Sequence, residues 1–362
     1  MSLRTEEAGA FASLSRFHFF GAKKLRSIFD LCHSYRAAYE ANSAALLKAG
    51  LSETEAASFI KRRNPRQPEK DALWLKKEGI RTLTADDPEF PALLREISDP
   101  PAALHCLGSP AGQAAAVAIV GTLRASRYGL LMAESISRGL TEAGLIVVSG
   151  LAIGIDSRAH LSALKANGKT WAFLGSGLNA GNVYPPSNRG LAREIIARGG
   201  ALFSEFPPGV SGYKHIFPIR NRLIAGSTLG TIVIEAGEKS GSLITASAAL
   251  DYGREIFALP GDVRSELSRG PHSLLRRGAC LIESADDVLK ELGFANRAQK
   301  SEYKASDQEL PILNAIAREP VSSDDLSRVV GLTTTETARI LSLLEIRGAI
   351  IKQDGGLWAR TY

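Results

Sequence analysis

The sequence lacks the features that mark secreted, membrane-spanning and metal-binding proteins. Its three cysteines, Cys32, Cys106 and Cys280, are far apart and form no C-x-x-C pair, which argues against a structural zinc site and against a disulfide framework. There is no run of about 18 apolar residues that would span a membrane. Residues 1–10 hold no apolar segment of the kind a signal peptide needs. We therefore expect a protein of the reducing cytoplasm, with no metal ion and no cofactor.

The composition is that of a soluble, mildly basic protein. Of the 362 residues, 44% are hydrophobic and 23% are charged, which is ordinary for globular proteins and suits two or three domains. There are 44 Lys and Arg residues against 38 Asp and Glu, so the net charge is +6. A positive charge suits a polyanionic partner such as nucleic acid, but charge alone leaves that open. The position of the charges has to decide.

Changes of pattern along the chain predict three domains. Residues 1–85 are helical in pattern and include a helix over 53–62, which Ser52 caps and which ends before Pro65. Residues 86–295 alternate helical stretches with short apolar runs at 117–120, 145–148, 170–174, 201–203, 231–234 and 255–259. Unbroken apolar runs are typical of parallel strands that are covered on both faces. The segment therefore predicts an α/β domain with a Rossmann-like, doubly wound, mostly parallel sheet.

The C-terminal part predicts a winged helix-turn-helix domain. A polar linker over 296–308 precedes a compact segment over 309–362. Three helices are expected in this segment, and Ser322 and Thr333 each begin a helix with an acidic residue three positions later. A hairpin over 349–360 follows, with a glycine-rich turn. Three helices and then a hairpin is the order of a winged helix.

The loops that follow the strands hold the candidate site, because ligands of open α/β sheets bind at the carboxyl ends of the strands. The first such loop, residues 121–129, is not G-x-G-x-x-G, so it carries no dinucleotide fingerprint. Thr122, Arg124 and Ser126 precede a helix there and are candidates for contacting a phosphate. The alternative is an ordinary turn with solvated arginines.

The next two loops are less specific. Gly150 follows the second run, and Asp156 and His160 stand one helical turn apart beyond it. Two such groups are too few for a metal site, so we interpret Asp156 as a helix cap and His160 as bonded to nearby backbone. The loop after the third run permits close approach of a ligand, or equally a tight turn, and reads Gly175, Ser176, Gly177.

The loop after the fourth run is the most informative. Near Tyr213, cations and polar groups alternate with an aromatic residue: Lys214, Phe217, Arg220, Asn221 and Arg222. Cations suit the phosphates of a strand and aromatic faces suit its bases, which is how sequence-tolerant single-strand binding works. The alternative is that Phe217 belongs to the core, that Arg220 pairs with a carboxylate, and that Lys214 is merely exposed.

The loop after the fifth run begins a helix with small residues that suit an anion: Ser240, Gly241, Ser242 and Thr245. Hydroxyl and amide groups at a helix N-terminus favour a phosphate, although ordinary capping by Ser240 or Ser242 is the alternative. We expect these loops to converge at one edge of the sheet. The sequence thus predicts a surface for single-stranded DNA.

Six strings occur in consistent order between residues 86 and 292. They are AIVG at 118–121, SGLAIGID with AH at 149–160, YP at 184–185, FPIRNRLIAG at 217–226, VIEAGEKSGSLITA at 233–246 and REIFALPG at 254–261. Together they resemble the DprA family, also called Smf, of DNA-processing proteins. The front segment resembles that family's SAM-like domain, and the tail resembles its winged-helix domain.

The resemblance implies single-stranded DNA as a partner. It also implies loading of RecA recombinase, protection of incoming DNA during natural transformation, and homodimers built through the Rossmann-like domain. By position, Lys214 and Phe217 match the family's phosphate and base contacts, and Arg220 and Arg222 add to its basic pocket. Leu123 stands where the family usually has arginine, with Arg124 one place later.

A second departure concerns the dimer. His272 lies near a position where the family often has asparagine. In the family this neighbourhood lies near the dimer surface, so the resemblance makes Leu275 and Leu281 candidate apolar contacts between two copies of the chain.

Two rival functions fit parts of the sequence. Nucleotide phosphoribohydrolases resemble this fold and carry P-G-G-x-G-T-x-x-E, but residues 229–235 have another spacing and lack the glycine pair. We therefore expect no enzyme activity. A winged-helix transcription regulator is the other rival. The predicted third helix offers Arg339 and Arg347 beside Glu336 and Glu345, whereas strong duplex readers show more positive charge.

Overall fold

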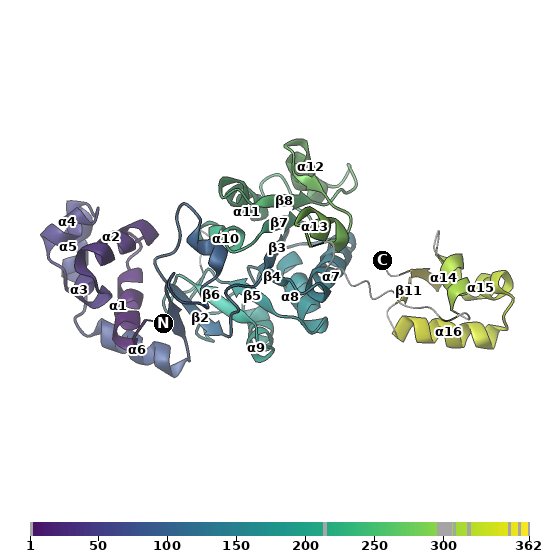
Figure 1. Cartoon of the computed structure of the whole chain (residues 1–362), viewed down its shortest axis with the longest axis horizontal. Helices are drawn as coiled ribbons and strands as arrows, with labels where there is room; N and C mark the ends of the chain where they lie inside the picture. Colours follow the sequence, from purple (N-terminus) through teal and green to yellow (C-terminus); the bar gives the residue numbers. More distant parts are fainter. Residues whose placement is uncertain are drawn as a thin grey trace. The chain divides into compact units, whose positions relative to one another are not determined.

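The described residues fall into two compact units, within residues 1–298 and within residues 299–362. The computed structural model (Figure 1) describes residues 3–212, 216–294, 306, 309–316, 320–346, 349–353 and 356–360. The boundary predicted near residue 85 falls inside the first unit. No helix in the described ranges is long and apolar enough to cross a membrane.

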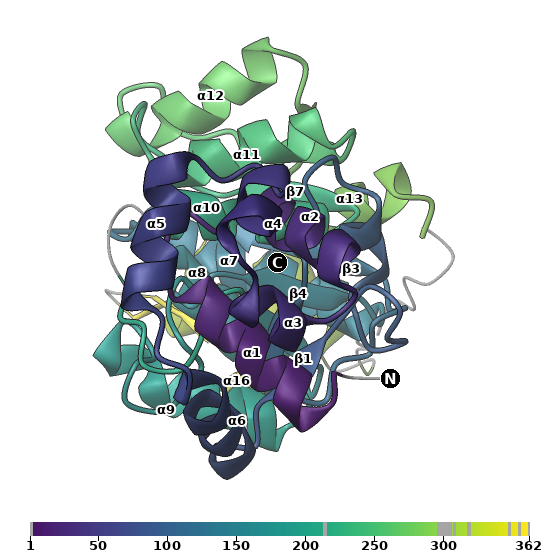
Figure 2. The ribbon, with the colours of Figure 1, turned by 90° about the vertical axis from the view of Figure 1, so that its left-hand side faces the viewer.

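The front part of the first unit is helical, as predicted. Its helices are α1 (Thr5–Ser15), α2 (Ala22–Cys32), α3 (Tyr35–Glu40), α4 (Ser43–Lys48), α5 (Glu53–Arg62) and α6 (Gln67–Lys77). The capping box at Ser52 and Glu55 begins α5. Helix α1 packs so closely on α6 that a Cβ on Gly9 would lie 2.3 Å from the Pro68 carbonyl oxygen. Figure 2 shows these helices in front of the sheet.

The rest of the first unit is built on one mixed sheet. In the described residues it has the strand order β1-β2-β6-β5-β4-β3-β7-β8-β9. The strands are β1 (Arg81–Leu83), β2 (Leu104–Gly108), β3 (Ala116–Val120), β4 (Ile146–Ser149), β5 (Thr170–Phe173), β6 (Ala201–Ser204), β7 (Gly230–Val233), β8 (Glu255–Ala258) and β9 (Cys280–Leu281). The strands from β6 to β9 in this order run parallel, whereas β1 and β2 pair antiparallel at one edge.

The predicted fold class is confirmed, and all six predicted runs are strands. One detail of the helical front segment was wrong, since residues 81–83 form β1. Thr82 and Leu83 are buried there against the sheet edge, which outweighs the helical pattern of the residues before them. The short strands β1, β2 and β9 were not predicted.

Helices cover both faces of the sheet. Alternate residues of β3 enter two different cores, with Ala118 in one and Val117 in the other. On the face of Val117 lie α7 (Arg127–Glu142), α8 (Ile155–Lys165), α9 (Arg189–Ala197) and α13 (Ala285–Glu291). On the face of Ala118 lie α10 (Ile216–Gly226), α11 (Gly241–Asp251) and α12 (Arg269–Arg276). Chain order reverses between β3 and β7, and such a switch point opens a crevice for ligands.

The second unit is a winged helix, as predicted. It consists of α14 (Leu310–Ala315), β10 (Val321–Ser322), α15 (Ser323–Val330), α16 (Thr334–Ile346), β11 (Ile350–Lys352) and β12 (Leu357–Arg360). The sheet has the order β10-β12-β11. Ser322 caps α15, and Thr333 and Glu336 bond reciprocally at the start of α16. Leu326, Leu344 and Trp358 are buried in its core.

Candidate functional site

A cavity of about 1000 Å³ opens at the carboxyl ends of β3, β4 and β7. Its walls come from the loops after these three strands, from the start of α10, and from Tyr184 and Pro185. It therefore lies at the switch point between β3 and β7, where the doubly wound fold places its ligands. A cavity of this volume is at the upper end of the range for ligand sites.

The cavity gathers most of the residues that the sequence singled out. Those that line it are Thr122, Arg124, Gly150, Phe217, Arg220, Asn221, Ser240, Gly241, Ser242 and Thr245. Those that do not are Ser126, Gly175, Ser176, Gly177 and Arg222. Lys214, together with Tyr213, lies outside the described residues. The loops therefore converge as expected, except that the loop at residues 175–177 does not reach the cavity.

Arg220 is largely buried but lines the cavity. Its guanidinium donates to the carbonyl oxygens of Gly150, at 2.6 Å, and of Phe173. Only 5% of the residue is exposed, and burial lowers its pKa to about 10. Its Nη1 donates to both carbonyls and its Nε donates to Asn221 Oδ1 at 3.1 Å, so Arg220 fixes α10 against the ends of β4 and β5. The phosphate contact that the sequence suggested for Arg220 stays a prediction.

Asp156 is the carboxylate that faces Arg220. It accepts hydrogen bonds from the amides of Gly150, at 3.0 Å, and Ala152, at 3.4 Å. It does not cap α8, whose N-cap is Gly154. Burial raises the pKa of Asp156, and the charge of Arg220 acts in the opposite direction. His160, one turn later, bonds Thr170 Oγ1 at 2.7 Å rather than the backbone. Asp156 therefore lines the cavity and holds the loop after β4, whereas His160 does not line the cavity and holds α8 against β5.

Two aromatic rings form one wall of the cavity. The centroids of Phe217 and Tyr184 are 5.7 Å apart, and their planes are inclined at 34°. Tyr184 is 48% exposed. The Arg220 guanidinium lies 5.8 Å from the Phe217 ring centroid. A Cβ on Gly175 would lie 2.9 Å from that ring, so Gly175 supports Phe217 from behind, without lining the cavity.

The rim carries exposed apolar and cationic side chains that the sequence reasoning largely missed. Leu123, Ile153 and Ile244 are 57%, 45% and 45% exposed and all line the cavity. Arg124 and Lys239 are exposed on the same rim, and no carboxylate pairs with either within the described ranges. These rim residues could have been predicted from their positions in the loops that follow the predicted strands.

The N-terminus of α11 opens onto the cavity. Ser240 caps the helix, and its hydroxyl also contacts the hydroxyl of Ser242 at 2.7 Å. Asn221 donates to the Gly241 carbonyl at 3.1 Å and so joins α10 to this turn. The first turn holds no acidic residue. Capping by Ser240 is therefore confirmed, and the anion site at this open helix end stays a prediction.

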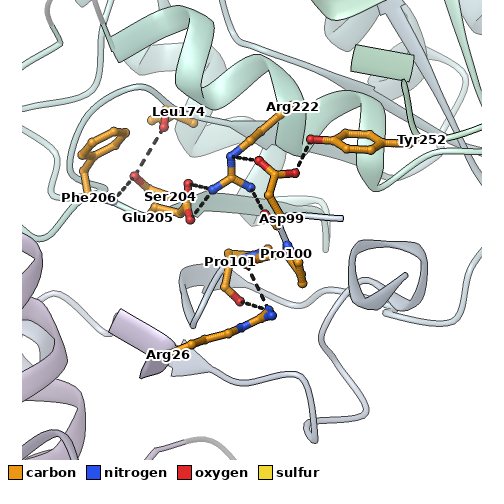
Figure 3. A network of polar contacts seen from close by, with 10 residues as sticks. All are labelled: Arg26, Asp99, Pro100, Pro101, Leu174, Ser204, Glu205, Phe206, Arg222 and Tyr252. Carbon is orange, nitrogen blue, oxygen red and sulfur yellow. Dashed lines mark hydrogen bonds and ion pairs between the residues drawn. The ribbon is translucent and has the colours of Figure 1, made fainter. Parts of the chain in front are cut away.

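Arg222 does not line the cavity and is held by the carboxylates of Glu205 and Asp99 (Figure 3). It donates to both carboxylate oxygens of Glu205, each at 2.6 Å, and its Nε lies 3.4 Å from Asp99. The hydroxyl of Tyr252 donates to the same Asp99. Next to Asp99, the carbonyls of Pro100 and Pro101 accept from Arg26 of α2. Arg222 thus links α10 to the helical front segment.

The loop at residues 175–177 packs against a neighbouring segment of backbone. The Gly177 amide donates to the Val210 carbonyl at 2.8 Å, and the Ser176 carbonyl accepts from Ser204 Oγ at 2.7 Å. A Cβ on Gly177 would lie 2.5 Å from the Pro207 carbonyl oxygen. Of the two interpretations, the geometry favours the tight turn over direct contact with a ligand.

The residues expected at a dimer surface lie near the β9 edge of the sheet. Leu281, in β9, is 53% exposed, and Leu275, in α12, is half-buried. His272 accepts from the Gly261 amide at 3.4 Å. Their role in a dimer stays a prediction. Within the described residues, no three His, Cys, Asp or Glu side chains are grouped so that they could hold a metal ion.

Comparison with known families identifies two matching regions. Residues 81–293 match the family described as DNA recombination-mediator protein A, and residues 296–356 match the DprA winged helix domain. The chain is 35% identical to Protein Smf of Escherichia coli, over 86% of this chain and 85% of that protein. It is 37% identical to DNA processing protein DprA of Bacillus subtilis, over 69% of this chain and 82% of that protein.

Two solved structures with similar sequences also match. The X-ray structure of DNA processing protein A from Streptococcus pneumoniae aligns with a TM-score of 0.67 at 31% identity, over 80% of this chain and 99% of that one. DNA processing protein A from Helicobacter pylori aligns with a TM-score of 0.52 at 30% identity, over 58% of this chain and 95% of that one. The latter structure is described as showing a single-stranded DNA binding mode.

Proposed function

The chain belongs to the DNA recombination-mediator protein A family, and from this premise we propose that it binds single-stranded DNA in the cavity between β3 and β7. The observation that carries the proposal is the make-up of the cavity. Aromatic and aliphatic side chains form its walls, exposed cations lie on its rim, and a helix N-terminus opens into it. A strand with unstacked bases and charged phosphates needs both kinds of surface.

In this proposal the bases enter the cavity and the phosphates stay at the rim. Phe217 and Tyr184 offer ring faces on which bases stack, and any base can use them because every base has a π-face. Arg124 and Lys239 are exposed and unpaired within the described residues, so they are free to neutralise phosphates. The amides at the start of α11 supply a further anion contact. Lys214 is proposed as an additional cation on its sequence position alone.

We propose a supporting role for the two buried arginines. Arg220 holds the floor under Phe217 through the carbonyls of Gly150 and Phe173, and Arg222 holds α10 through Glu205. Both set the position of the aromatic wall, so their loss should weaken DNA binding through the fold rather than through a lost phosphate contact.

The wider role is proposed on family membership. In that role the protein protects incoming DNA in the cytoplasm and loads RecA recombinase onto it during natural transformation. It acts as a homodimer through the neighbourhood of Leu275 and Leu281. A binding role is favoured over a catalytic one, because the buried Asp156 and Arg220 in the cavity are bonded to backbone groups.

The winged helix is proposed to contact protein rather than to read duplex DNA. The exposed face of α16 includes Glu336, Arg339 and Glu345, in which acidic groups outnumber the cation. Helices that read duplex DNA carry an excess of positive charge. Arg347 lies outside the described residues.

The proposal is tested by a salt titration of binding to a fluorescent single-stranded oligonucleotide. Arg124→Glu and Lys239→Glu should each weaken binding for any base sequence. Each should also reduce the slope of log K against log salt by about 0.7, the contribution of one phosphate contact on a single strand. Lys165→Glu is the matched control, since Lys165 is exposed at the end of α8 and does not line the cavity. Equal losses in all three variants would reject the cavity as the binding site.

A further inference from the structure

The helix that follows β3 has its N-terminus filled by a carboxylate of the protein itself. Helix α7 begins after Ser126, and Glu235, two residues beyond β7, reaches across to it. The Glu235 carboxylate accepts a hydrogen bond from the Ser126 amide at 2.9 Å and another from the Ser126 hydroxyl. In doubly wound folds that bind nucleotides, this is the place where the phosphate of the ligand lies.

The fit between Glu235 and α7 is close. A Cβ on Gly129, in the first turn of α7, would lie only 2.2 Å from Glu235 Oε2. The Glu235 residue is 5% exposed. Its main chain is fixed as well, since its carbonyl oxygen accepts from the Thr122 amide at 2.8 Å. The carboxylate therefore packs against the first turn of α7 and is buried.

No cation pairs with Glu235 in the described part of the chain. A buried carboxylate costs free energy unless donors or positive charge compensate it. Here the compensation comes from the amide and hydroxyl of Ser126 and from the positive end of a 16-residue helix. The same interactions stabilise a bound phosphate at a helix N-terminus. In this protein they stabilise the Glu235 carboxylate instead.

The neighbouring helix end differs. The first turn of α11 contains no acidic residue, and Ser240, Gly241 and Ser242 line the cavity. No acceptor side chain other than their own hydroxyls is bonded to this turn in the described residues. Helices α7 and α11 thus begin after adjacent strands at the switch point. Glu235 occupies the N-terminus of α7, whereas the N-terminus of α11 is open to the cavity.

We propose that Glu235 is a specificity-determining residue that excludes phosphate from the α7 N-terminus. By filling that seat, Glu235 denies a mononucleotide or dinucleotide the anchor that other doubly wound folds provide. The seat at α11 is then left for phosphate, beside the aromatic wall. The consequence for DNA rests on the proposed function, whereas the exclusion of phosphate does not.

The test uses inorganic phosphate and the full-length protein, with no DNA present. Glu235→Ala empties the seat and should bind phosphate saturably, with the chemical shifts of the Ser126 and Gly129 amides moving. Phosphate at about ten times Kd should raise the melting temperature of this variant by about 2–4 °C above that of the same variant without phosphate, a rise that wild type should not show. Glu235→Gln keeps the seat filled without charge and should bind none. Glu238→Ala, which removes an exposed carboxylate three residues later, is the control and should match wild type.

Two results would overturn the proposal. One is a folded Glu235→Ala protein that takes up no more phosphate than wild type. The other is a saturable shift of the Ser126 and Gly129 amides in wild type or in the Gln variant, and this decides the matter even if the Ala variant does not fold. A separate titration with single-stranded DNA distinguishes the two proposals. Wild-type protein that binds no DNA would reject the proposed function and leave the phosphate result standing.

Discussion

The guanidinium of Arg220 donates to the carbonyl oxygen of Gly150 at 2.6 Å, which ties α10 to the loop after β4. The approach is so close that a Cβ on Gly150 would lie 2.5 Å from the centre of the guanidinium. Because Phe217 lies one turn before Arg220 on α10 and lines the cavity, this contact fixes the position of the aromatic wall. The site therefore depends on a buried cation that need not meet the ligand.

Replacing Gly150 by alanine tests this contact. The added methyl group must displace a buried, hydrogen-bonded guanidinium, so Gly150→Ala should lower the free energy of unfolding by about 1–3 kcal/mol. Gly190→Ala is the matched control, because no atom lies within 4 Å of a Cβ at that helical position. It should be neutral or slightly stabilising. Chemical denaturation measures both, and equal stabilities of the two variants would contradict the assigned contact.

Phe217 should contribute to DNA binding by stacking. Phe217→Ala should weaken binding to single-stranded DNA by about 1–3 kcal/mol, the range for loss of one base–aromatic contact. Phe217→Tyr should retain most of the affinity, because the ring face is kept. Ile219→Ala is the control, since Ile219 is 47% exposed on the same helix but does not line the cavity. A loss in the Ile219 variant as large as in the Phe217 variant would point to damage to α10 rather than to stacking.

A new cation at Leu123 should increase the affinity for DNA. Leu123 is 57% exposed on the rim of the cavity. Leu123→Arg should add one phosphate contact, tighten binding at low salt and steepen the salt dependence by about 0.7 in log–log slope. Leu131→Arg makes the same charge change at a 49% exposed position of α7 that does not line the cavity. If both variants steepened the slope equally, net charge rather than the rim would be the cause.

Two buried histidines should make the protein less stable in acid. Burial lowers the pKa of His160 to about 3 and that of His105 to about 4, from an ordinary value of 6.5. Thr170 Oγ1 donates to the Val147 carbonyl, so His160 Nδ1 must donate to Thr170. The low pKa then leaves Nε2 unprotonated, so the ring is neutral at neutral pH. Below pH 6.5 the unfolded chain takes up protons that the folded chain does not, so stability falls as the pH drops towards 4.

The expected slope is about 1.4 kcal/mol per pH unit for each histidine. His160→Leu should reduce the slope of unfolding free energy against pH, between pH 6 and 4, by about that amount, whatever it does to stability at neutral pH. Denaturant titrations at a series of pH values measure this. An unchanged slope would mean that His160 is protonated in the folded protein.

Much of the architecture could be predicted because buried parallel strands appear in the sequence as apolar runs. β3 and β4 read as unbroken stretches of Ala, Val and Ile, and helix ends such as Ser52 and Ser322 carry their capping residues in the local sequence. Because the carboxyl ends of parallel strands meet at one edge of the sheet, the loops after them could also be placed there. In contrast, β9 has two residues and β2 includes a buried histidine, so neither shows a periodic pattern.

The parts of the site that escaped prediction depend on contacts between distant residues. Arg222 meets Glu205 and Asp99, and Ser126 meets Glu235 109 positions later in the chain. Local sequence shows a cation or a hydroxyl but not which partner the fold brings to it. The sequence predicted Arg220 at a phosphate, and it could not show that the ends of β4 and β5 present its guanidinium with carbonyl groups.

The most direct test of the account is where a bound strand lies on the protein. An oligonucleotide of mixed sequence that carries iodouracil should be bound, cross-linked by light and mapped by peptide mass spectrometry. The account predicts cross-links at Phe217 and Tyr184, and their loss in the presence of excess unlabelled single strand. Specific cross-links confined to the front helices or to the winged helix, with the cavity unlabelled, would contradict it.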